Sequence, residues 1–171
     1  AKLKEKVKDR LFAIANDIIK IAAARELVNG IQINTDKKIL EDFQKSAGFD
    51  YTKDQKRSIR EIFADISSGR VMDRLLSGDV GFGKTEVAMN AMLAVILDGY
   101  QAIFVCPTTL LATQHYHSMQ KRFSEFGISI AKLDGKTPAK EKTHIKKGLE
   151  SGEIKLVIGT HSLLEIETNN L

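Results

Sequence analysis

The sequence has very little cysteine and no long apolar run, and both absences narrow the class of protein. The single cysteine, Cys106, rules out a disulfide within the chain, which favours a reducing, cytoplasmic setting. No stretch approaches the roughly 20 apolar residues that a membrane span needs, and no signal-peptide pattern is present. There is also no internal repeat and no low-complexity segment. We therefore expect a cytoplasmic protein without a membrane contact.

The composition that remains is that of an ordinary globular domain. Of the 171 residues, 43% are hydrophobic and 28% are charged, which is enough apolar material for one buried core. The formal net charge of +4 permits phosphate-rich partners but does not by itself indicate them. The chain starts inside a helical pattern and stops just after an expected strand, so we expect it to be a piece of a longer protein.

The first third of the chain has helical periodicity. Apolar residues at three- and four-residue spacing predict an amphipathic helix over residues 3–28, ended by Asn29 and Gly30. Shorter helices are expected over 36–46 and from Thr52 to Gly69. We interpret residues 1–48 as a helical extension. The favoured role of its first helix is a brace packed on the rest of the chain, and the alternative is a docking element for a partner protein.

From residue 72 the pattern changes to alternating strands and helices. The expected strands are 72–77, 102–106, 128–133 and 155–159, and the expected helices between them are 84–97, 110–126 and 139–150. Such alternation predicts right-handed βαβ units and a parallel sheet. Residues 49–171 are therefore predicted to form an α/β domain.

A phosphate-binding motif lies between the first expected strand and the following helix. Its residues match G-x-x-x-x-G-K-[ST] at every fixed position, in the order Gly78, Asp79, Val80, Gly81, Phe82, Gly83, Lys84, Thr85. The glycines let the backbone fold around a phosphate, so that amides and the helix N-terminus face the anion. Lys84 is expected to reach the β- and γ-phosphates, and the Thr85 hydroxyl to hold Mg²⁺. The alternative is a glycine-rich turn without a ligand.

A second Gly-Lys-Thr, at residues 135–137, does not complete this motif. The position five residues before Gly135 is Ile130, where the motif requires glycine. We expect a surface turn there.

Residues upstream of the P-loop carry a signal for an adenine base. Thr52 and Gln55 have the spacing of a capping box at a helix start. A glutamine about 30 residues before Lys84, preceded by Phe49 and Tyr51, also resembles the adenine-reading Q motif of superfamily 2 helicases. The two interpretations are compatible, since a capped helix can present the Gln55 amide to a base while Phe49 covers it.

Two further segments follow expected strands and carry hydroxyl and imidazole side chains. Alone, each is explained by the end of a strand and the cap of a helix. In this order after a P-loop they resemble motifs Ia and Ic of superfamily 2 helicases, where such groups hold the DNA backbone. The candidate DNA-binding residues are Thr108, Thr109, Gln114 and His115 in the first segment, and Gly159, Thr160 and His161 in the second.

Taken together, these motifs resemble the bacterial transcription–repair coupling factors. The likeness is carried by residues 72–89, 107–116 and 158–164, and it covers nearly the whole chain. RecG-type branch-migration helicases share the layout but usually have a small residue where this chain has Phe82. Glu86 also favours the coupling factors. We expect Glu86 to be one of the nucleotide-binding residues. The residues at 134–137 depart from the coupling-factor pattern, which leaves the RecG-type alternative open.

The resemblance implies a RecA-like P-loop NTPase lobe, truncated, that uses ATP and Mg²⁺. It also implies a double-stranded DNA translocase that displaces stalled RNA polymerase and recruits excision-repair proteins through parts outside this chain. The acidic metal-binding motif and the second lobe are not among these 171 residues. We therefore expect the chain to bind ATP without useful turnover.

Two other classes of protein share a phosphate loop or a helical extension of this kind. A small P-loop kinase or signalling NTPase needs its own metal-binding aspartate and base, and neither Asp73 nor Asp79 occupies such a position. A non-catalytic interaction module remains an alternative for the chain by itself.

Overall fold

A computed structural model describes residues 2–165, so the last six residues of the expected domain lie outside the described part. Four helices come first: α1 (Lys2–Glu26), α2 (Lys38–Lys45), α3 (Lys53–Ser67) and α4 (Lys84–Leu97). Strands and helices then alternate as β1 (Ala102–Val105), α5 (Thr109–Ser124), β2 (Ile130–Leu133), α6 (Ala139–Glu150), β3 (Leu156–Gly159) and the short 3₁₀ helix η1 (His161–Glu165). No helix in the described part is long and apolar enough to cross a membrane.

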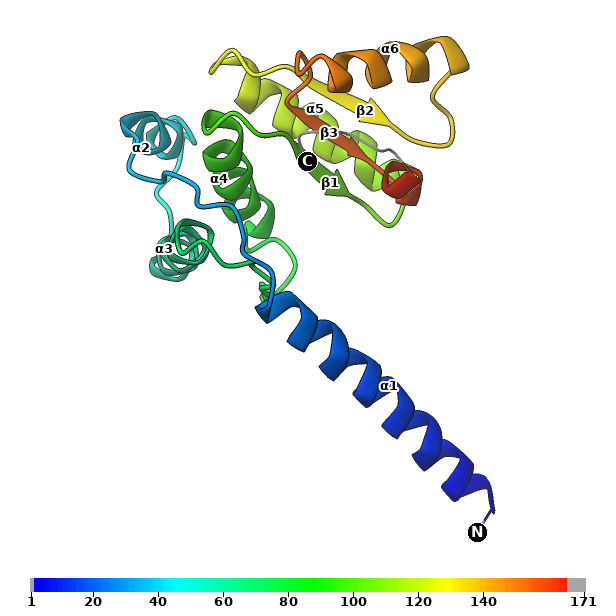
Figure 1. Ribbon diagram of the computed structural model, residues 1–171. Coiled ribbons are helices and arrows are strands. Elements are labelled where there is room, and N and C mark those ends of the chain that lie inside the picture. The colour runs from blue at the N-terminus through cyan, green and yellow to red at the C-terminus, as the bar shows by residue number, and fades with distance from the viewer. Residues whose placement is uncertain (1, 166–171) are drawn as a thin grey trace.

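The three strands form a parallel sheet in the order β1-β3-β2. All four residues of the central strand β3 are buried, which is typical of a strand covered on both faces. The β1–α5–β2 and β2–α6–β3 connections cross the sheet in opposite directions, with their helices on opposite faces (Figure 1). Both connections therefore have the same hand, as βαβ units require.

The alternation of side chains along β3 divides the core between the two faces of the sheet. Leu156 and Ile158 pack with α4 and α5 in the larger core. Val157 points the other way and packs with residues of α6, among them Ile145 and Leu149. Because successive side chains along a strand point to opposite faces, β3 presents apolar residues to the helices on both sides of the sheet.

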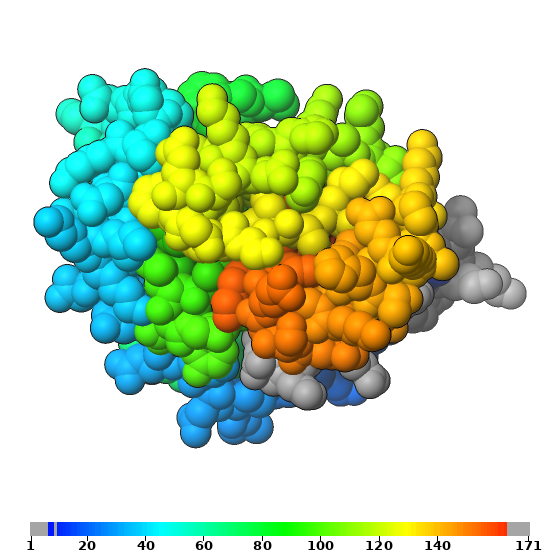
Figure 2. Space-filling view, turned by 90° about the horizontal axis from the view of Figure 1, so that it is seen from above, coloured from blue at the N-terminus to red at the C-terminus, as the bar shows by residue number. Residues whose placement is uncertain are grey.

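The two short helices before the P-loop join this body through α4. Leu40 and Phe43 of α2 are buried in the same core as α4 and α5, although α2 lies in the predicted extension. Ile59 and Ile62 of α3 pack on Val87 of α4 in a smaller cluster. Seen from above, α2 lies directly against the region that follows α5 (Figure 2). The division of the chain at residue 48 stays a prediction.

The expected strand over residues 72–77 is wrong. The segment has no partner among the described strands, and the nearest bridge joins Asn29 to Arg70. Leu75 is 91% exposed. A strand exists only where a neighbour satisfies its backbone groups, and an apolar run before a P-loop does not show which neighbour that is. The other three strands are confirmed, each one or two residues shorter than expected.

The prediction that α1 braces the rest of the chain by packing on it is also wrong. α1 extends away from the body (Figure 1), and its apolar residues from Val7 onward are exposed, as in Ile18 with 61%. Its attachment lies at its C-terminal end, where Arg25 pairs with Asp73 and the Gly30 amide donates to the Gly69 carbonyl over 2.8 Å. Helical periodicity predicts that a face is apolar but does not identify the surface that covers it.

Candidate nucleotide-binding site

The P-loop turns into α4 through two glycines in left-handed conformations. Gly81 has φ of 86°, and Gly83, the N-cap of α4, has φ of 73°. Residues other than glycine rarely adopt this region of φ. A Cβ built on Gly83 would also lie 2.4 Å from Gln55 Nε2, which would have to move aside, but the left-handed φ is the stronger reason for glycine. The shape of the loop therefore depends on glycine at this position.

The loop presents donors at the start of α4. Within the described residues, the amides of Gly81, Gly83, Lys84 and Thr85 donate to no protein acceptor. The first amides of any helix lack intrahelical partners, and the helix dipole adds partial positive charge at the same end. This end of α4 is thus suited to an anion with several acceptor oxygens.

Lys84 folds back over its own loop. Its Nζ donates to the carbonyl oxygens of Gly78 at 2.5 Å and Asp79 at 2.7 Å. The ammonium is therefore held beside the same turn whose amides are free.

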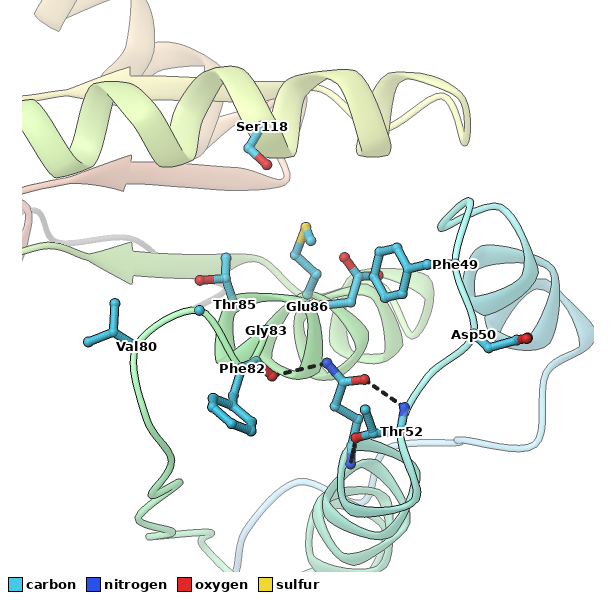
Figure 3. Close-up of a pocket in the computed structure, with 12 residues that line it drawn as sticks. Phe49, Asp50, Thr52, Val80, Phe82, Gly83, Thr85, Glu86 and Ser118 are labelled. Carbon is cyan, nitrogen blue, oxygen red and sulfur yellow. Dashed lines mark hydrogen bonds between the residues drawn. The ribbon is translucent and has the colours of Figure 1, made fainter.

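A cleft of about 640 Å³ opens between the P-loop and the start of α3 (Figure 3). The P-loop forms one wall, the residues around the start of α3 form the other, and α4 contributes three lining residues and α5 one. The lining residues are Phe49, Asp50, Thr52, Gln55, Val80, Gly81, Phe82, Gly83, Thr85, Glu86, Met89 and Ser118. The structure thus brings residues 80–83 and Thr85 of the predicted phosphate loop to one cleft with the predicted base residues Phe49 and Gln55. Gly78 and Lys84 instead line a neighbouring hollow that shares Gln55 and Phe82 with this cleft.

Gln55 connects the two walls of this cleft. The capping box is confirmed, since Thr52 Oγ1 accepts from the Gln55 amide at 3.2 Å and Gln55 Oε1 accepts from the Thr52 amide at 2.9 Å. Gln55 Nε2 also donates to the Phe82 carbonyl at 3.1 Å (Figure 3). A glutamine amide has two donors and two acceptor lone pairs, so one of each remains for a base.

Replacing Gln55 with alanine is expected to narrow the preference for ATP over GTP by about tenfold, because one donor and one acceptor for the base edge are lost. If Gln55 acts only as a cap, the variant should instead lose about 1 kcal/mol of stability and keep its base preference. Competition between the two nucleotides, with thermal melts of both proteins, distinguishes the results. Gln44→Ala, on the neighbouring helix α2, is the control.

Glu86 lines the cleft, but its carboxylate is engaged with protein groups. Glu86 is 8% exposed, and its Oε1 accepts from Arg122 Nη2 at 2.8 Å and from the Tyr51 hydroxyl. Burial, together with the hydrogen bond to Glu86, raises the pKa of Tyr51 above its ordinary value, so the hydroxyl stays a donor. The sequence did not indicate Arg122, which lies near the end of α5 without a motif around it.

The two candidate DNA segments lie side by side at the carboxyl edge of the sheet. The Cys106 amide, just after β1, donates to the Gly159 carbonyl at the end of β3 over 2.7 Å. Thr108 caps α5 through a hydrogen bond from the Leu111 amide at 3.3 Å, Thr109 begins the helix, and Gln114 is exposed.

The remaining members of these segments differ in exposure. His115 is turned toward the sheet, with its ring 5.1 Å from that of Phe104, edge to face. His161 is exposed and Thr160 half-buried. A Cβ on Gly159 would meet the Leu133 carbonyl oxygen at 1.7 Å, so close packing between β3 and β2 is a structural reason for that glycine.

The second Gly-Lys-Thr forms the expected turn. Asp134 is buried, and its Oδ1 accepts from the Lys136 amide at 2.8 Å and from the Thr137 hydroxyl at 3.3 Å. Burial alone would raise the pKa of Asp134, but these bonds and the ammonium of Lys132 at 3.1 Å hold it below its ordinary value. The side chains of this turn are engaged with one another, unlike the free amides of the P-loop.

Comparison with known proteins gives relatives at high identity. The chain is 49% identical to the transcription-repair-coupling factor of Helicobacter pylori (strain J99) over 170 residues, covering 99% of this chain and 17% of that protein. It is 43% identical to the transcription-repair-coupling factor of Bacillus subtilis (strain 168) over 163 residues, covering 95% of this chain and 14% of the relative.

A solved structure of RecG bound to a three-way DNA junction superposes with a TM-score of 0.86. The two sequences are 43% identical, and the match covers 95% of this chain and 23% of the RecG chain. The fold is therefore that of a RecA-like helicase lobe. The chain spans less than a fifth of the length of the two curated relatives. Residues 52–170 match the DEAD/DEAH box helicase family, and the chain belongs to that family.

Proposed function

We propose that this chain binds ATP with Mg²⁺ in the cleft beside the P-loop and forms part of the first motor lobe of a double-stranded DNA translocase. The observation that carries the proposal is a complete P-loop, with free amides and Lys84, at the N-terminus of α4. The fit to a triphosphate is supported by the glycine geometry, because the left-handed φ of Gly81 and Gly83 turns the loop into the N-terminus of α4.

In this proposal different residues of the chain bind the phosphates, the metal ion and the base of the nucleotide. The amides of Gly81–Thr85 bind the β- and γ-phosphates, and Lys84 Nζ leaves the Gly78 and Asp79 carbonyls for a phosphate oxygen. The Thr85 hydroxyl would hold Mg²⁺, which would supply neutralisation of the phosphate charge. Phe49 covers the base and Gln55 contacts its edge.

The DNA contacts that we propose are individually weaker than the phosphate contacts of the P-loop. Thr108, Gln114, Thr160 and His161 lie at one edge of the sheet and offer hydroxyl, amide and imidazole groups to a sugar–phosphate backbone. Such groups position DNA but do not read its sequence. His115 has its ring against Phe104 and is supported less well than the others.

The activity proposed for the whole protein follows the relatives. We propose a cytoplasmic translocase that displaces stalled RNA polymerase and connects transcription to nucleotide excision repair, with those partners bound outside these 171 residues. The names of the curated relatives support this assignment. A RecG-type branch-migration helicase is the second candidate, favoured by the structure with a three-way DNA junction.

We expect the chain to bind duplex DNA weakly and without sequence preference, since it supplies backbone contacts from one lobe only. Affinity should fall about tenfold or more between 50 and 200 mM salt, because counterions are released on binding. Fluorescence anisotropy with two unrelated duplexes measures both properties. The double variant Gln114→Ala/His161→Ala should weaken binding, and Ser151→Ala, at the C-cap of α6, should not. Tight, salt-insensitive binding to one of the duplexes would contradict the proposal.

A further inference from the structure

A buried charged cluster lies behind the base-side wall of the cleft. At its centre is the guanidinium of Arg122 on α5, whose side chain is 13% exposed. Its Nη2 donates to Glu86 Oε1 and to the Phe43 carbonyl, each at 2.8 Å, and its Nη1 donates to Ser46. The same guanidinium lies 4.1 Å from the centre of the Phe43 ring. One side chain therefore ties α5 to α4 and to α2.

The cluster continues from Glu86 to the wall itself. The carboxylate that pairs with Arg122 also accepts from the Tyr51 hydroxyl, and Asn90 Nδ2 donates to that hydroxyl at 3.1 Å. The Tyr51 ring in turn packs against Phe49, with ring centres 5.6 Å apart. A continuous series of contacts thus leads from Arg122, which does not line the cleft, to Phe49, which does.

This cluster is more costly than packing alone would require. Burying an ion pair takes both charges out of water, and apolar residues of similar volume often stabilise a fold as well or better. In the described part of the chain, Asn90 Oδ1 and Arg122 Nε are also buried without a partner. The buried ion pair and the unpartnered polar atoms both cost free energy of folding. We explain their presence by a requirement that these side chains hold particular positions.

Apolar packing supports one end of this wall, since Tyr51 is buried with Ile59, Ile62 and Val87. Phe49 is 53% exposed, and residues 47–50 form a turn between α2 and α3. The capping box fixes the chain only from Thr52 onward. Phe43 and Ser46, at the start of this turn, and Tyr51, at its end, are all held by the cluster.

We propose that Arg122 is a positioning residue for the base. Through Glu86 and Tyr51 it sets where Phe49 stands across the cleft, and so determines the part of the affinity that comes from the base rather than from the phosphates. This inference rests on the proposed function, because it takes the cleft to be an ATP site.

The test compares ATP with inorganic tripolyphosphate, which has the phosphates without the base. Calorimetry on the 171-residue chain is expected to show that Arg122→Met lowers the affinity for ATP by about tenfold and that for tripolyphosphate by no more than about twofold. Thermal melts record the loss of stability in parallel. A merely structural role would weaken both ligands together or neither.

Lys37→Met is the matched control. Lys37 Nζ donates to the Leu97 carbonyl and to Asp98, each at 2.8 Å, at the other end of α4, so it repeats the chemistry of Arg122 away from the cleft. This variant should lose stability and keep the ratio of the two affinities.

Two milder variants keep the test decisive if Arg122→Met does not fold. Tyr51→Phe removes only the hydroxyl, and Arg122→Lys keeps the charge but loses the planar fork. Both should lower the affinity for ATP and leave tripolyphosphate binding unchanged.

The inference is overturned if all three variants keep the wild-type ratio of the affinities, or if both ligands weaken equally. A wild-type chain that binds tripolyphosphate no more weakly than ATP would overturn it as well, while leaving the phosphate site intact. A wild-type chain that binds neither ligand would overturn the proposed function and the inference with it.

Discussion

Replacing Lys84 with alanine is expected to lower the affinity of the chain for ATP by about 100-fold, or roughly 2.7 kcal/mol. The ammonium forms charge-assisted hydrogen bonds to phosphate oxygens, which are among the stronger contacts available in a partly solvated cleft. The fold should be little affected, because within the described residues the Lys84 ammonium hydrogen-bonds to carbonyls of its own loop and to no other element. Calorimetry with ATP and a thermal melt measure the two effects.

The control for this variant is Lys146→Ala. Lys146 is an exposed lysine on α6, so its loss makes the same change in net charge away from the cleft. Equal affinity for ATP in the wild-type chain and the Lys84 variant would refute the P-loop assignment. A fall of similar size in the Lys146 variant would show that the effect is one of net charge.

The isolated chain is expected to bind ATP and yet release phosphate no faster than its Lys84→Ala variant. Hydrolysis requires a second carboxylate for the metal, a group that orients water and, in this class of enzyme, an arginine. Thr85 lines the cleft, and Lys84 lies beside it on the carbonyls of its own loop. Two carboxylates line the cleft, Asp50 and Glu86, and Glu86 is held by Arg122. Loss of an arginine finger alone lowers the rate by about 10³ to 10⁵.

A phosphate-release assay on the purified chain, with and without duplex DNA, tests this expectation. Turnover at several per second that disappears in the Lys84 variant would mean that these 171 residues contain a complete catalytic set. The interpretation of the chain as part of a motor lobe would then be wrong.

The parts of the fold that the sequence predicted well are those with local signals at both ends. The helices over 84–97 and 139–150 are confirmed to the residue. Gly83 begins the first and Gly99 follows its end in a left-handed turn, while Pro138 precedes the second and Gly152 follows it. Capping and terminating residues of this kind act within one turn of the helix, so they can be identified from the local sequence alone.

The parts that sequence reasoning missed depend on partners far away in the chain. An apolar segment at 72–77 has the composition of a strand, but pairing decides whether it becomes one. The stripe on α1 has the correct period and no surface against it in the described residues. Arg122 meets Glu86 across 36 positions, and nothing near either residue indicates the other.

The central claim is that the turn from Gly78 to Thr85 binds the triphosphate of ATP. A crystal structure of the chain with Mg²⁺ and a non-hydrolysable ATP analogue tests it most directly. We predict phosphate oxygens on the amides of Gly81–Thr85, with Lys84 Nζ moved from the Gly78 and Asp79 carbonyls onto a phosphate. A nucleotide bound elsewhere, with Lys84 still on those two carbonyls, would contradict the claim.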